Sequence, residues 1–245
     1  MDQSEYDIGL HGYVSGFGRA SKLSATFDLQ AEELAHQLRD CNYDQIAMIG
    51  HSMGGLMCMA AVRNLIDARA FSTIQRLACL VLIGTPQAGS VRVPFWARWL
   101  SHDLKLLAAH SATLTEIQRR FTDHVVVSMF EQSFGSRFVI PTFAVVGTAD
   151  RWVTDLSATL RIPSEQVRRI SGRHTDIAKP ADSESEVFKF ARDRVTASIA
   201  FHQDRNHKHR EIRGRLSRFI DENLRGTEQL IASAIIGVDP NERRE

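Results

Sequence analysis

A pentapeptide between an apolar run and a stretch of small residues constrains the fold of this chain more than any other feature. Gly50-His51-Ser52-Met53-Gly54 follows the apolar residues 46–49 and precedes a helix-like segment that opens at Gly55. A serine on a sharp turn between a strand and a helix takes a strained backbone conformation and needs small neighbours. The pattern predicts such a turn, with Ser52 as candidate nucleophile. The amide of Met53 would then face the place where a carbonyl oxygen becomes negative.

Strand-like and helix-like patterns alternate along most of the chain. Strand-like patterns predict strands at about 45–49, at 77–83 and 142–147, and near 167–170, and apolar spacing predicts helices near 28–38, 53–68 and 184–200. Continuous apolar strands separated by helices are typical of parallel strands buried on both faces. The sequence therefore predicts an α/β domain over residues 1–200 with a doubly wound, mostly parallel sheet. The apolar stripe of the first helix is expected to include Leu29, Leu34 and Leu38, together with Ala31 and Ala35.

The N-terminal stretch Tyr6 to Val14 also has the pattern of a strand and ends in turn-rich residues. One helical segment separates it from the strand before Ser52. The order of elements therefore makes it the strand directly before that one in the chain.

A mixed polar and apolar region, about 91–133, interrupts the alternation and predicts a helical cap insert. Phe95, Trp96 and Trp99 lie near its start. These three side chains are candidate substrate-binding residues that would line an acyl pocket under a lid. Aromatic residues at this spacing are equally typical of a buried helix, so the sequence leaves both interpretations open.

Beyond residue 200 the composition changes to a basic tail, 201–245, with Ile212, Leu216, Phe219 and Ile220 at helical spacing. The pattern predicts an added amphipathic helix. Two roles fit it: peripheral contact with an anionic membrane surface, or packing of the apolar side against the main domain.

A serine nucleophile needs a base within hydrogen-bond reach and a carboxylate that orients the base. His174 and Asp150 both follow predicted strands, in loops at the edge of the sheet where ligands bind. Asp155 and Asp176 are alternatives for the carboxylate, the latter more typical of a loop or capping residue. His51, inside the pentapeptide, is expected to pack or to form a hydrogen bond there.

Composition narrows the classes of function. The chain has 245 residues, 43% hydrophobic content and a net charge of +1, so neither nucleic acid nor an acidic partner is indicated. No His, Cys and acidic residues stand at metal-ligand spacing. Three cysteines fit a reducing compartment, and the N-terminus has no signal-peptide pattern. The expected location is cytoplasmic.

Four motifs together resemble the lipase and esterase branch of the α/β-hydrolases, over about residues 5–200. They are Gly50-His51-Ser52-Met53-Gly54-Gly55, the segment Gly84 to Ser90, Gly147-Thr148-Ala149-Asp150 with Val153, and the segment His174 to Pro180. The sequence is most similar there to GPI-inositol-deacylase-like and serine-active-site-containing proteins. The order Ser, Asp, His is also that of the family.

The resemblance implies that Ser52, Asp150 and His174 are catalytic, that the substrates are small-molecule or lipid esters, and that no cofactor is needed. It also implies a second oxyanion donor from an earlier strand. The order of elements places that strand outside this chain, so Met53 is the one expected oxyanion donor unless the amide of Tyr13 or Val14 substitutes for it. A weak or inactive module that binds lipid or protein, and an acyltransferase, are the alternatives to a hydrolase.

Overall fold

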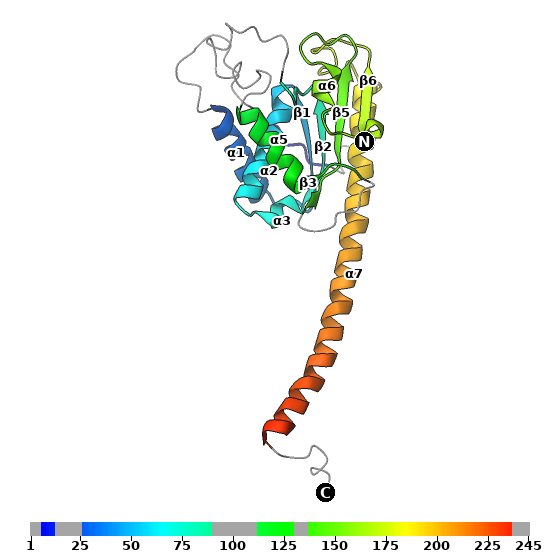
Figure 1. The fold of residues 1–245 in the computed structure, drawn as a ribbon. Helices are drawn as coiled ribbons and strands as arrows, with labels where there is room; N and C mark the ends of the chain where they lie inside the picture. Colours follow the sequence, from blue (N-terminus) through cyan, green and yellow to red (C-terminus); the bar gives the residue numbers. More distant parts are fainter. Residues whose placement is uncertain (1–5, 13–25, 90–111, 130–136, 237–245) are drawn as a thin grey trace. The chain divides into compact units, whose positions relative to one another are not determined.

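The computed structural model describes residues 6–12, 26–89, 112–129 and 137–236 of the chain (Figure 1). The chain divides into two units, residues 1–199 and residues 200–245.

A four-stranded parallel sheet forms the centre of the first unit. In spatial order its strands are β1 (Ile46–His51), β2 (Leu77–Ile83), β5 (Thr142–Gly147) and β6 (Val167–Ile170). All three neighbouring pairs run parallel, so helical crossovers connect the strands. This confirms the α/β class and the mostly parallel sheet. The bounds of β2, β5 and β6 are those that the sequence predicted. A second, small sheet pairs β3 (Val125–Val126) with β4 (Phe138–Val139).

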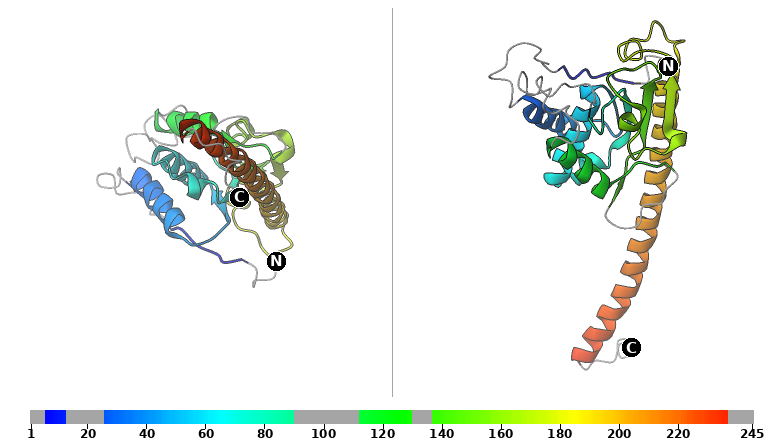
Figure 2. Two further views of the ribbon diagram at one scale, coloured as in Figure 1. Left: turned by 90° about the horizontal axis from the view of Figure 1, so that it is seen from below. Right: turned by 45° about the horizontal axis from the view of Figure 1, so that its top comes forward.

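Helices cover both faces of the main sheet. The helices among the described residues are α1 (Thr26–Asp40), α2 (Met53–Asp67), α3 (Phe71–Ile74), α5 (Ala112–His124), α6 (Asp155–Ala158), a 3-10 helix η2 (Ser164–Gln166), and α7 (Glu186–Ile236). On one face α1 lies beside α2, as the views in Figure 2 show. On the other face the first turns of α7 pack Val187 and Val195 into one cluster with Val81 and Val145. Because both faces are covered, every residue of β2 is buried.

The buried side of α1 agrees with the expected stripe at Ala31, Ala35 and Leu38 and differs from it at Leu29. Phe27, Ala31, Ala35 and Leu38 are buried, whereas Leu29 is 58% exposed. The expected inclusion of Leu29 was wrong because positions 27, 31, 35 and 38 follow the helical repeat better than 29 does.

The expected strand from Tyr6 to Val14 is also wrong in its described part. Residues 6–12 have no strand structure, and Ile8 and Leu10 are 83% and 94% exposed. His11 instead approaches α1, where its Nδ1 lies 3.1 Å from Gln37 Oε1. An alternating pattern forms a strand only where a neighbouring strand receives its hydrogen bonds. Among the described residues, β1 therefore lies at one end of the sheet and pairs with β2 alone.

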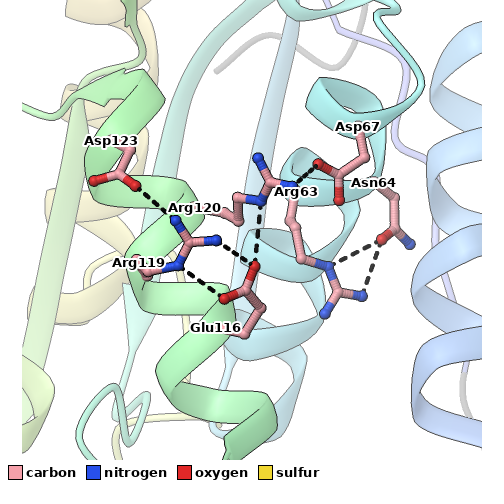
Figure 3. Close-up of polar contacts among 7 residues, drawn as sticks. All are labelled: Arg63, Asn64, Asp67, Glu116, Arg119, Arg120 and Asp123. Carbon is pink, nitrogen blue, oxygen red and sulfur yellow. Dashed lines mark hydrogen bonds and ion pairs between the residues drawn. The ribbon is translucent and has the colours of Figure 1, made fainter.

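Helix α5 is fixed to α2 by its buried side and by surface charges. Leu114, Ile117 and Phe121 belong to the same core cluster as the buried side of α2. Figure 3 shows the charged contacts, in which Arg120 lies 3.3 Å from Asp67 of α2 and also pairs with Glu116. Exposed ion pairs of this kind contribute only about 0–1 kcal/mol each, so the apolar contacts hold the helix in place.

The described part of the expected cap insert, residues 112–129, contains α5 and β3, and Phe95, Trp96 and Trp99 lie outside the described residues. The sequence predicted a helix over 184–200 and an added amphipathic helix after it. Residues 186–236 form one helix, α7, of 51 residues. Within the described part of the chain, no helix is long and apolar enough to cross a membrane.

Candidate active site

Ser52 occupies the turn between β1 and α2 in a strained conformation. Its backbone angles are φ 53° and ψ −122°. A positive φ is energetically unfavourable for any residue other than glycine. The amide of Ser52 donates a 2.8 Å hydrogen bond to the carbonyl of Ile83 on β2, which holds the turn against the sheet. A Cβ atom on Gly50 would lie 2.6 Å from the backbone of Gly55. The close approach of strand and helix at this turn therefore requires glycine at position 50.

His174 follows β6 and reaches Ser52 across the edge of the sheet. Its Nε2 lies 2.9 Å from the Ser52 Oγ, although 122 residues separate the two in the sequence. The imidazole is mostly buried, with 15% of its side chain exposed. A neutral imidazole with this contact can receive the serine proton when the hydroxyl attacks a carbonyl carbon.

Asp150 follows β5 and completes a chain of three polar groups. Its Oδ2 lies 2.7 Å from His174 Nδ1, and its side chain is 1% exposed. The other oxygen, Oδ1, accepts hydrogen bonds from the amides of Trp152 and Val153 at 2.8 and 3.0 Å. With Nδ1 donating to the carboxylate, Nε2 is the nitrogen left to accept the proton from Ser52.

The two alternative carboxylates have other partners. Asp155 pairs with Arg169 at 2.6 Å, and this hydrogen bond lowers the pKa of Asp155. Asp176 accepts hydrogen bonds from both the side chain and the amide of Arg173 at 3.0 Å, which lowers its pKa. Of these three carboxylates, only Asp150 contacts the imidazole.

His51, directly before Ser52, contacts the loop that holds His174. Its Nε2 lies 3.1 Å from the backbone oxygen of His174, and the two rings lie 4.8 Å apart at 45°. Burial lowers the pKa of His51, and the neighbouring His174 lowers it further. A neutral His51 has one N–H, and its donation to the His174 carbonyl connects the turn at Ser52 with the loop of His174. The sequence predicted a packing or hydrogen-bonding residue here but not this partner.

Gly84, directly after β2, is a neighbour of the His174 imidazole. The sequence did not predict a role for this glycine at the site. It has a positive φ of 53°, and a Cβ atom there would lie 3.2 Å from His174 Nδ1. The absent side chain therefore leaves room for the ring. Its signal in the sequence is a glycine directly after a continuous apolar strand.

Met53 is the first residue of α2, so its amide is at the positive end of the helix dipole beside Ser52. Tyr13 and Val14, considered as sources of a second donor, lie outside the described residues. Across the described ranges there is no group of three or more His, Cys, Asp or Glu side chains that could hold a metal ion.

Comparison with known proteins gives one family match. The model of the alpha/beta hydrolase family matches residues 10–182. Among solved structures, the chain is similar to that of the type II thioesterase BorB from the borrelidin biosynthetic cluster, with 20% sequence identity and a TM-score of 0.36. That similarity covers 72% of this chain and 70% of the thioesterase. No curated protein matches the sequence.

Proposed function

The chain belongs to the alpha/beta hydrolase family, and from this premise we propose that it is a serine hydrolase that cleaves carboxylic esters through an acyl-enzyme. One observation carries the proposal: the hydrogen-bonded series from Ser52 Oγ to His174 Nε2 and from His174 Nδ1 to Asp150 Oδ2, at 2.9 and 2.7 Å. These three groups take the roles of nucleophile, base and orienting acid.

In the first half of the proposed reaction, Ser52 Oγ attacks the ester carbonyl carbon while His174 Nε2 takes its proton. The carbonyl electrons move to the oxygen, and the amide of Met53 donates to the resulting oxyanion. When the tetrahedral intermediate collapses, the bond to the leaving alcohol breaks, and His174 returns the proton to the alcohol oxygen. An acyl group is then attached to Ser52.

In the second half, water takes the place of the alcohol. His174 accepts a proton from the water as its oxygen attacks the acyl carbon, and the same proton returns to Ser52 as the acid product leaves. The buried carboxylate of Asp150 stabilises the imidazolium in both halves and keeps the ring in the required tautomer. Amides and thioesters would react through the same groups.

Lipid esters are the proposed substrate class within the carboxylic esters. Two sequence motifs support this choice, from Gly50 to Gly55 and from Gly84 to Ser90. Both resemble motifs of the lipase branch and of its GPI-inositol-deacylase-like members. Turnover of p-nitrophenyl acetate and octanoate tests chain length, and a preference for octanoate supports a lipid substrate.

The decisive comparison is the rate of the wild-type chain beside Ser52→Ala and His174→Ala. His36→Ala on the exposed side of α1 is a control for loss of a histidine. We expect the rate to disappear in the two site variants and to persist in the control. Equal rates in all four chains would refute the proposal. An added alcohol distinguishes the acyltransferase alternative, since that enzyme would form the new ester in preference to the free acid.

A further inference from the structure

The described part of α7 within the second unit has a concentrated positive charge. Residues 204–218 contain six Lys or Arg and two Asp or Glu, whereas the whole chain has a net charge of +1. Every residue from Arg210 to Leu216 is exposed, and so is Lys208. A helix with this charge has a strong electrostatic preference for an anionic partner.

Two large apolar side chains are exposed within the same basic segment. Ile212 is 62% exposed and Leu216 is 55% exposed. They are four residues apart, and Lys208 precedes Ile212 by the same step, so the three form one row along the helix.

Basic residues border this row on both sides. Arg215 follows Ile212 by three positions, and Arg213 precedes Leu216 by three, which places the two arginines on opposite sides of the row. Lys208 and Arg215 each pair with an acidic residue one turn earlier, Asp204 and Glu211, at 2.7 Å. These pairs are solvent-exposed and weak, so the lysine and the arginine can exchange them for an anionic surface. Lys208, Ile212, Arg213, Arg215 and Leu216 form what we call the basic row.

We propose that the basic row docks on an anionic lipid surface, with Ile212 and Leu216 inserted among the acyl chains and with Lys208, Arg213 and Arg215 on the lipid phosphates. Exposed apolar residues flanked by Lys and Arg are the pattern of helices that lie in the membrane interface. The flexible stems of the basic side chains allow their charges to stay at the headgroups while the apolar residues are buried.

The other occupants fit this surface less well. Nucleic acid would satisfy the charges but would leave the isoleucine and the leucine against a polar backbone. A second copy of the same row would bring like charges together. An anionic bilayer supplies both phosphate and hydrocarbon, and therefore complements every member of the basic row.

Binding of the full chain to vesicles tests the proposal, independently of hydrolysis. We expect binding to vesicles of equal parts phosphatidylglycerol and phosphatidylcholine, little binding to phosphatidylcholine alone, and weakening as salt is raised. Ile212→Gln with Leu216→Gln removes the apolar pair, and Arg213→Gln with Arg215→Gln removes the flanking charges. Glutamine is a good helix former, so the helix should be kept, which circular dichroism checks.

A matched pair of substitutions separates the basic row from general charge. Arg210→Gln with Arg218→Gln also removes two positive charges, but from other sides of the helix. We expect the Arg213 and Arg215 pair to lower affinity about thirtyfold, since each basic residue near an anionic surface contributes about fivefold. The control pair should lower it much less.

Three results would each overturn the proposal: equal losses of affinity from the two arginine pairs, no loss in Ile212→Gln with Leu216→Gln, or preferential binding of duplex nucleic acid. Because hydrolysis of soluble p-nitrophenyl acetate is measured separately, failure of docking and failure of the proposed function are distinguishable.

Discussion

His51 Nε2 lies 3.1 Å from the backbone oxygen of His174, across 123 residues of sequence. This contact joins the turn at Ser52 to the loop that holds His174. Replacing His51 with phenylalanine keeps a ring but removes the donor. We expect kcat to fall about tenfold to a hundredfold with KM little changed, because small displacements of a catalytic group have effects of this size. His51→Gln can still donate and should recover part of the loss. A KM increase at unchanged kcat would instead indicate a role in substrate binding.

Asp150→Asn should lower kcat by about four orders of magnitude. An amide in place of the carboxylate favours the wrong tautomer of His174 and does not stabilise the imidazolium. Asp155→Asn and Asp176→Asn are matched controls, because Asp155 begins α6 and pairs with Arg169, whereas Asp176 lies two residues after His174 and pairs with Arg173. Steady-state rates on p-nitrophenyl acetate measure the difference. If Asp155→Asn were as damaging as Asp150→Asn, the assignment of the orienting acid would be wrong.

Gly84→Ala should lower activity more than its effect on stability explains. An alanine at position 84 would have to adopt a positive φ, which is unfavourable by about 1–2 kcal/mol. Its methyl carbon would also lie 3.2 Å from His174 Nδ1. We expect a lower Tm and at least a tenfold lower kcat at a temperature where the variant is folded. Gly214→Ala in α7 has open space around it and is the control. Full activity in folded Gly84→Ala would show that the ring has more freedom than the contact indicates.

The three cysteines should differ in their reaction with iodoacetamide. Burial raises the pKa of Cys58 and of Cys79 to about 12, so neither forms thiolate at about pH 8 in the folded chain. Cys41 is only half-buried. Mass spectrometry should find one alkylated cysteine under native conditions and three in urea. Rapid native labelling of Cys58 would contradict this difference in reactivity.

The same two buried thiols should make stability depend on pH. Since both thiols have their pKa raised by folding, the free energy of unfolding should decrease as pH rises from about 9 to 12.

The sequence predicted the two inner strands of the sheet well because every residue of β2 and β5 is buried. Such strands are continuous apolar runs, and the bounds of β2 (Leu77–Ile83) and β5 (Thr142–Gly147) follow from them directly. Ser52, Asp150 and His174 were each found from a local signal, a glycine-flanked turn or a polar residue after a strand. In the structure, the side chain of His174 lies within hydrogen-bond distance of both Ser52 and Asp150.

The features that the sequence did not reveal depend on contacts between distant residues. Tyr6 to Val14 has the alternation of a strand, but residues 6–12 have no pairing partner among the described strands, and no local pattern reports that absence. The bond from His51 to the carbonyl of His174 joins two loops whose proximity arises only when the sheet has formed. The continuity of α7 was missed because a change in composition after residue 200 was interpreted as a boundary between helices.

In the proposed mechanism Ser52 is an activated nucleophile, and covalent labelling with a fluorophosphonate tests this role most directly. The reagent needs a reactive serine but not the natural substrate. We predict one adduct per chain, mapped to the peptide that contains Ser52, absent in Ser52→Ala and greatly slowed in His174→Ala. Retention of labelling in Ser52→Ala, or no labelling of the folded wild-type chain, would contradict it.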